Sequence, residues 1–137
     1  MKNHTALFRY SWRLEANPTL REAMVVVDDS KVQKLLTEIT RRSWTEVLES
    51  DIAGSSFDDV ITQVEHAELT NDQRVYVLWE RPKPQQGIVI PFSLFKEGWD
   101  DLWYPSSDDV VVVDEQISVI IRFSHEERLS IYQNLST

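Results

Sequence analysis

The chain has 137 residues, no cysteine and a formal net charge of −9. This length predicts one domain, spanning 1–137, with enough apolar residues for a single core. The lack of cysteine excludes disulfides, thiolate metal sites and a cysteine nucleophile. No apolar run reaches the length of a membrane span, and the N-terminus lacks the apolar core of a signal peptide, so we expect a cytoplasmic protein.

Charge is distributed unevenly along the chain. Residues 1–42 hold eight basic and five acidic residues, a net of +3, whereas residues 43–137 hold six basic and eighteen acidic residues, a net of −12. The segments 43–73 and 97–115 together contain fifteen acidic residues and no lysine or arginine. Such a field repels nucleic acid and anionic lipid and attracts basic proteins. An acidic surface that only maintains solubility is the alternative.

The N-terminal segment allows two structures, and the segment after it is predicted to be a helix. Apolar side chains alternate over residues 8–14 as in a strand, whereas Asn17-Pro18 is a favourable helix start. Across residues 32–39, apolar residues recur at i, i+3, i+4 and i+7. A cap at Asp29 or Ser30 precedes them, which predicts an amphipathic helix.

Two further helices are predicted in the first half. Ser43-Trp44-Thr45-Glu46 has the form of a capping box, and Trp44, Val47 and Leu48 then share one side of a short helix. Ser56 precedes a helical apolar pattern over residues 57–64. Asp58 and Asp59 fall in the first turn of that helix, where its dipole favours acidic side chains. We therefore assign this aspartate pair a structural role.

The second half is predicted to form mainly strands, because it is rich in β-branched and aromatic residues. The predicted strands are 74–80, 88–90, 110–113, 117–123 and 128–133, the last of them preferred over a short helix. Pro91 should end its strand or place that strand at a sheet edge. Residues 93–102 are polar and aromatic at near-helical spacing.

This order of elements predicts an α+β fold. A helical N-terminal half would pack on an antiparallel sheet of about four to five strands from the C-terminal half. Because strands and helices do not alternate, no nucleotide crevice is expected. The sequence contains no phosphate loop, no nucleophile-elbow serine and no paired zinc-binding histidines, so we predict no cofactor and no metal.

One segment, 97–109, concentrates the residue types that recognise cations. Its part 99–109 contains four aspartates, two tryptophans and one tyrosine. Carboxylates accept paired hydrogen bonds from arginine, and aromatic faces stack on guanidinium or ammonium groups. Tryptophan and tyrosine also dominate the energetic centres of protein interfaces. The predicted partner-binding residues are Glu97, Asp100, Asp101, Trp103, Tyr104, Asp108 and Asp109.

Two other interpretations of the same residues stay open. The aromatic residues could belong to the core, with Tyr104–Ser107 forming a turn whose backbone the aspartates bond. Alternatively, Asp100, Asp108 or His125 could act as acid–base groups in a small enzyme if the fold gathers them in a pocket. A self-associating adaptor domain is a third possibility, and a long uncovered strand edge would indicate it.

The pattern W-D-D-x-W-Y-P-S-S-D-D at Trp99–Asp109, followed by a hairpin and Ser124-His125-Glu126, resembles a family of small bacterial proteins. The resemblance includes the RVYVLWE strand and covers residues 74–132. Some proteins of this kind look like immunity proteins that accompany polymorphic or contact-dependent toxins. The resemblance implies a protein that binds its toxin and blocks it, and it implies no catalytic residue.

We therefore expect a non-enzymatic, protein-binding inhibitor. Its partner would be a basic protein, specifically a cognate toxin such as a nuclease, because a nuclease must present lysine and arginine to phosphates. Glu97, Asp100, Asp101, Asp108 and Asp109 would form the charged face, with Trp103 or Tyr104 as the anchor. The oligomeric state is left open by the sequence.

Overall fold

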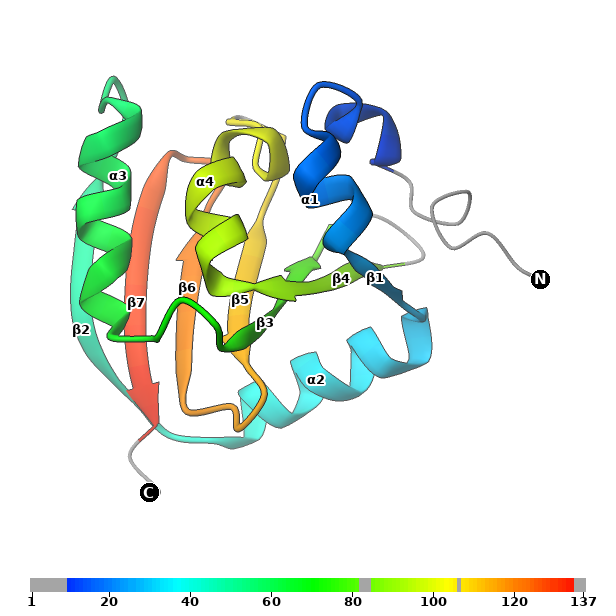
Figure 1. The fold of residues 1–137 in the computed structure, drawn as a ribbon. Coiled ribbons are helices and arrows are strands. Elements are labelled where there is room, and N and C mark those ends of the chain that lie inside the picture. The colour runs from blue at the N-terminus through cyan, green and yellow to red at the C-terminus, as the bar shows by residue number, and fades with distance from the viewer. Residues whose placement is uncertain (1–9, 82–84, 106, 135–137) are drawn as a thin grey trace.

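A computed structural model describes residues 10–81, 85–105 and 107–134. These residues form one seven-stranded sheet in which all neighbouring strands are antiparallel, in the order β1-β4-β3-β5-β6-β7-β2 (Figure 1). The strands are β1 (Val25–Val27), β2 (Trp44–Asp51), β3 (Arg74–Trp79), β4 (Gln86–Pro91), β5 (Val110–Asp114), β6 (Val119–Phe123) and β7 (Arg128–Asn134). The helices are α1 (Pro18–Ala23), α2 (Asp29–Arg41), α3 (Phe57–Val64) and α4 (Phe92–Leu102), with short 3-10 helices η2 (Ser11–Leu14) and η3 (Glu65–Ala67).

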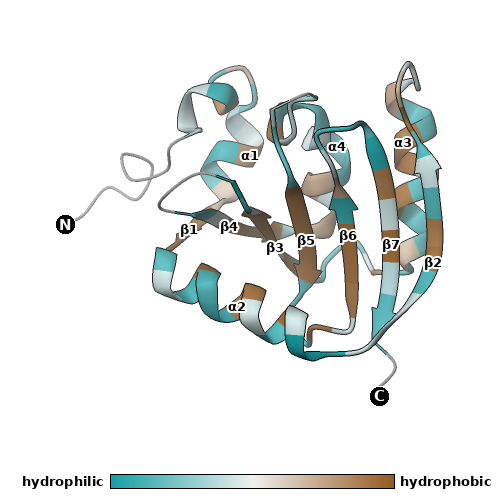
Figure 2. Ribbon diagram, turned by 180° about the vertical axis from the view of Figure 1, so that it is seen from behind, coloured by the Kyte–Doolittle hydropathy of each residue, from teal (hydrophilic) through white to brown (hydrophobic). Residues whose placement is uncertain are grey.

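Helices cover both faces of the sheet. The larger apolar core joins α1, α3 and α4 to one face, through side chains such as Leu20, Val60 and Phe95. A smaller core joins α2 to the opposite face through Val32 and Leu35, and Figure 2 shows the molecule from the side that carries this helix. Gly87 allows α2 to approach closely, because a Cβ atom there would lie 2.8 Å from the Cγ2 atom of Val32.

The predicted fold class was wrong in two respects. The sheet has seven strands rather than four to five, and its two edge strands, β1 and β2, come from the first half of the chain. The helices are not confined to that half either, since α4 lies between β4 and β5. The fold is α+β, but strands and helices are distributed along the whole chain.

The predicted helix at 43–48 is part of the edge strand β2. This strand pairs with β7 and carries a β-bulge between Glu46 and Leu48. The bulge transfers the alternation from one face to the other, so Trp44 packs with the α2 core and Leu48 with the larger core. Apolar residues four positions apart also fit the spacing of a helix, and this similarity explains the error.

Several other predictions are confirmed. Asn17 caps α1 by accepting a hydrogen bond from the backbone N–H of Leu20, so the helix start is the correct choice. Ser56 caps α3 in the predicted way. Residues 128–134 form a strand, and Pro91 is the last residue of β4, which lies inside the sheet. Residues 8 and 9 of the N-terminal segment lie outside the described part of the chain.

Candidate functional site

The strand registers bring three connections to one end of the sheet. Trp79, Val110, Phe123 and Leu129 lie in one row across β3, β5, β6 and β7, and β2 continues the row. The segments 52–56, 103–109 and 124–127 follow or precede this row directly. Figure 1 shows that the C-terminal end of α4 lies at the same end of the sheet. We call this region the acidic end, after its carboxylates at residues 100, 101, 108, 109, 126 and 127.

A kink in α4 positions the N-terminal segment against this end. Gly98 has φ −127° and ψ 17° inside the helix, which interrupts its regular geometry. A Cβ atom at Gly98 would lie 2.7 Å from Leu20 Cδ1 and 3.0 Å from Asn17 Nδ2, so glycine permits α1 to approach. Asn17 Nδ2 donates to Asp101 Oδ2 over 3.1 Å. This contact attaches the start of α1 to the last turn of α4.

Asp108 forms a buried ion pair with Arg13. The nitrogen Nη1 of Arg13 lies 2.6 Å from Asp108 Oδ2, and Nη2 lies 3.4 Å from Oδ1. The residues are 8 % and 4 % exposed, so solvent screens the pair little. The Asp108 carboxylate also accepts hydrogen bonds from the backbone N–H of Tyr104 and the hydroxyl of Ser107. It therefore closes the turn between α4 and β5.

Aromatic rings enclose the same guanidinium. The carbon Cζ of Arg13 lies 4.0 Å from the ring centre of Tyr10 and 3.7 Å from that of Tyr104. The indole N–H of Trp103 donates to the backbone oxygen of Asp108 over 3.1 Å. The motif thus has the predicted chemistry of carboxylate and aromatic rings around a cation, and the cation it holds belongs to this chain. Asp108 and Trp103 lie inside the protein, whereas the other predicted residues of the set are more exposed.

Asp109 connects two turns at the acidic end. Its Oδ1 accepts hydrogen bonds from the backbone N–H of His125 over 2.8 Å and lies 2.9 Å from the Nδ1 atom of that ring. Arg81 lies 3.6 Å from its other oxygen. Burial raises the pKa of Asp109, but these hydrogen bonds and the positive charges outweigh it, so the pKa lies below its ordinary value. The carboxylate is engaged in joining the turns.

A groove opens beside the Arg13 cage, the name used here for the carboxylate of Asp108 and the rings of Tyr10 and Tyr104 that surround the Arg13 guanidinium. We call it the tryptophan groove; its volume is about 200 Å³. Its lining residues are Ile52, Gly54, Ser55, Trp99, Asp100, Trp103, Pro105 and Glu127. Trp99 stacks on Phe57 and on Phe123, with ring centres 5.5 and 6.0 Å apart, so the groove wall is part of an aromatic cluster. Two of the lining residues, Asp100 and Glu127, are acidic.

Four carboxylates of the acidic end have no cationic partner within the part of the chain that the structure describes. Among the described residues, no lysine, arginine or histidine nitrogen lies within 4.0 Å of the carboxylates of Asp100, Asp101, Glu126 or Glu127. Burial and the adjacent charge of Asp101 raise the pKa of Asp100 above its ordinary value. Both causes show that this charge is poorly compensated. Glu97, also on α4, is exposed.

The exposed Trp12 contacts the partly exposed Tyr104 next to Arg13, and the sequence analysis missed Trp12 as a site residue. Trp12 is 56 % exposed and meets Tyr104 edge to face, with ring centres 5.9 Å apart. Arg13 was missed as well, although an arginine next to two aromatic residues at 10–12 is a recognisable cation–aromatic signal. The sequence does not show that Arg13 contacts Tyr104 and Asp108, which lie more than 90 positions later.

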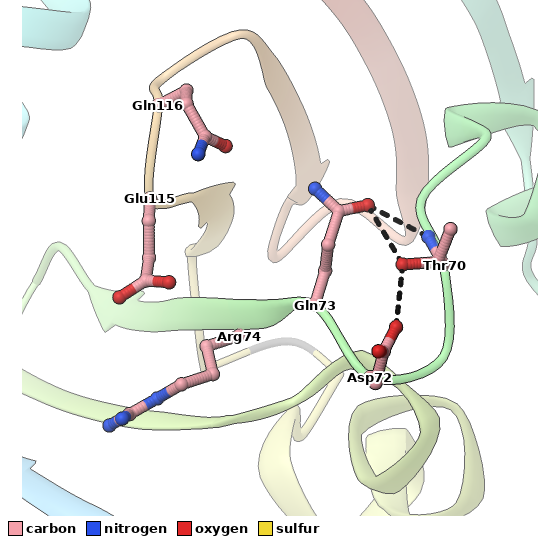
Figure 3. A pocket seen from close by; sticks show the side chains of 6 residues that line it. All are labelled: Thr70, Asp72, Gln73, Arg74, Glu115 and Gln116. Carbon is pink, nitrogen blue, oxygen red and sulfur yellow. Dashed lines mark hydrogen bonds between the residues drawn. The ribbon is translucent and has the colours of Figure 1, made fainter.

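A polar pocket lies at the opposite end of the sheet. Its volume is about 350 Å³, and Figure 3 shows its lining side chains. They are Thr70, Asp72, Gln73, Arg74, Glu115 and Gln116. Thr70 donates from its backbone to Gln73 over 2.8 Å and from its hydroxyl to Asp72 over 2.9 Å. These groups bond one another within a single turn, so the pocket is best explained as loop structure.

Comparisons with protein-family models, with curated proteins and with solved structures found no match to this chain. Within residues 10–81, 85–105 and 107–134, no helix is long and apolar enough to cross a bilayer. The same residues hold no group of three or more acidic or histidine side chains arranged to hold a metal ion. Function is therefore inferred from the chemistry of the acidic end.

Proposed function

We propose that this chain is a binding protein that docks its acidic end on a basic protein and blocks the partner's cationic surface. The observation that carries the proposal is a set of carboxylates that have no cationic partner among the described residues, two of them at an apolar groove. The exposed Trp12 and the partly exposed Tyr104 lie at the same end of the sheet. Charged groups of this kind increase the rate of encounter, and exposed aromatic residues supply binding energy.

The charge of the chain supports a basic partner. The segment 97–115, which builds much of the acidic end, contains no lysine or arginine. A protein that binds polyanions must present several cationic side chains, so an acidic surface of matching size would cover its active region. We propose a cationic toxin, such as a nuclease, as the partner. The resemblance of residues 74–132 to immunity proteins agrees with this class.

The burial of the two expected anchors supports a choice between them. Trp103, one of the two expected anchors, is 4 % exposed and packs in the core. Tyr104 is partly exposed, and Trp12 rests on it. A partner could bury Trp12 at little conformational cost, because the edge-to-face contact already orients the indole. We therefore propose Trp12 and Tyr104 as the anchoring pair.

The enzyme alternative required one pocket that gathers Asp100, Asp108 and His125. The tryptophan groove contains only the first of these. Asp108 is committed to Arg13, and His125 contacts Asp109 on the outside of the turn.

The self-association alternative required a long uncovered strand edge. The edge strand β2 is eight residues long, but its acidic side chains and its bulge are features that discourage edge pairing.

The test compares two variants with equal charge changes. The protein and both variants are used to capture partners from lysate of the source organism, and the captured protein is purified for titration at several salt concentrations. The site variant is Asp100→Asn, Asp101→Asn, Glu126→Gln and Glu127→Gln. The control variant is Glu22→Gln, Asp29→Asn, Glu46→Gln and Glu115→Gln, all at exposed positions away from the acidic end.

We expect a basic partner whose affinity falls with salt and falls at least about tenfold further in the site variant, since each lost contact removes charge-assisted hydrogen bonds. The control variant should change the affinity by no more than a few-fold, through long-range screening alone. An acidic partner, or equal losses in the two variants, would refute the proposal. Trp12→Ala should weaken binding by a similar factor without altering its salt dependence.

A further inference from the structure

We infer that the tryptophan groove is a socket for one arginine side chain of the partner, with the aliphatic stem against Trp99 and Trp103 and the guanidinium at Asp100 and Glu127. This inference rests on the proposed function, because it names how a basic partner engages the acidic end. It specifies a residue type and a pocket, whereas the proposed function requires only a complementary surface.

The size and lining of the groove suit one long side chain. Its volume of about 200 Å³ is below that of pockets for drug-sized ligands, which begin at roughly 300 Å³. Trp99 stacks on two phenylalanine rings, and only 8 % of this residue is exposed, so a ligand meets a small uncovered part of an aromatic wall. Such a wall favours methylene groups, which arginine and lysine carry between backbone and charge.

The two carboxylates favour arginine over lysine. Asp100 is on α4, and Glu127 is in the turn between β6 and β7, so they approach the groove from different elements. A guanidinium carries five N–H donors in a fixed planar fork and can serve two acceptors at once. An ammonium is a compact point charge that is more strongly hydrated. The partner residue that matches both carboxylates is therefore arginine.

The protein provides an internal precedent for this recognition. Arg13 is held by one carboxylate, that of Asp108, together with the rings of Tyr10 and Tyr104. The groove adjoins this cage, and Trp103 belongs to both, since its indole N–H bonds Asp108 while its ring lines the groove. The groove repeats the combination of carboxylate and aromatic wall, and its carboxylates have no cation among the described residues.

Five tryptophans make the inference directly measurable. Each indole N–H gives its own signal in a two-dimensional nitrogen–proton NMR spectrum, and Trp99 and Trp103 line the groove. The Trp99 N–H is buried without a hydrogen-bond acceptor among the described residues, so its signal should respond to small changes in the wall. Trp44 is the first residue of β2, and its indole N–H donates to the backbone oxygen of Ile39 in α2. Its signal therefore reports on the opposite end of the sheet.

The experiment titrates the whole protein with three capped tripeptides, glycine-X-glycine, in which X is arginine, lysine or citrulline. Citrulline has the shape of arginine without its charge. We expect saturable shifts of Trp99 and Trp103 with the arginine peptide, at millimolar affinity and with Trp44 unmoved. The lysine peptide should bind several-fold more weakly, and the citrulline peptide about tenfold more weakly or not at all.

A double variant, Asp100→Asn with Glu127→Gln, tests the carboxylates, and Glu46→Gln with Glu115→Gln is its charge-matched control. The double variant should lose at least about tenfold in affinity for the arginine peptide, and the control should lose less than about twofold. Equal binding of the citrulline peptide would overturn the inference. So would shifts confined to Trp12, because the cation would then sit on Trp12 and Tyr104. If the groove stays silent while the acidic end still binds a basic partner, the inference fails and the proposed function stands.

Discussion

The buried pair of Arg13 and Asp108 should be the most sensitive point of the acidic end. The change to test is Asp108→Asn, which preserves the shape of the side chain and removes its charge. The variant leaves a guanidinium that is 8 % exposed without a counter-ion. Removing one member of a buried ion pair typically costs about 3–5 kcal/mol. The asparagine oxygen can still accept from the backbone of Tyr104, so we expect about 3 kcal/mol, at the lower limit.

That loss is large relative to the whole stability of a domain, which is about 5–15 kcal/mol. Urea unfolding, followed by tryptophan fluorescence, should show a midpoint lower by roughly 1.5–2 M at an unchanged slope. Asp101→Asn is the matched control on the same segment. Its carboxylate is partly exposed and accepts from Asn17, so its change should cost less than about 1 kcal/mol.

A double variant separates the ion pair from simple loss of packing. Arg13→Met with Asp108→Asn removes both charges while keeping an apolar stem between the rings of Tyr10 and Tyr104. We expect this double variant to be more stable than Asp108→Asn alone, with a coupling energy of about 2 kcal/mol. The reasoning is refuted if Asp108→Asn costs less than about 1 kcal/mol. It is also refuted if the losses in stability of the single variants Asp108→Asn and Arg13→Met add up to the loss in the double variant.

Three further changes test separate features of the fold. Because the pKa of Asp100 is raised in the folded state, its charge destabilises the fold at neutral pH, and Asp100→Asn should raise the melting temperature at pH 7. This gain should vanish as the pH falls through the raised pKa towards the ordinary value of 3.8. Melting curves between pH 4 and 7 will show whether it does. Gly87→Ala should cost about 1–3 kcal/mol, because its methyl group would meet Val32 at 2.8 Å, and an unchanged urea midpoint would contradict this packing. Asp114→Ala should cost about 3 kcal/mol or more, since this fully buried carboxylate accepts backbone hydrogen bonds from Ser118 and Val119 in the β5–β6 turn. Asp114→Asn should cost less, and equal unfolding free energies for the two variants would refute that role.

Local structure was predictable wherever one periodicity ran unbroken. The helix at 32–39, the capped helix after Ser56 and the strands of the second half follow from regular apolar spacing and cap residues. The prediction was wrong at 43–48, because a bulge in β2 moves its inward side chains from one face to the other. A bulge depends on the partner strand, and β7 lies some 80 residues further along the chain.

The sequence by itself determined the chemistry of the acidic end. Carboxylates and aromatic rings clustered at 99–109 indicated recognition of a cation, whatever the fold. Only the tertiary structure decided which carboxylates meet which cation. The Gly98 kink and the docking of α1 bring Arg13 to Asp108, 95 positions away. Asp100 and Glu127 are left beside the groove without a cationic partner among the described residues. Residue types set what a side chain can bind, but the choice of partner depends on distances that packing alone establishes.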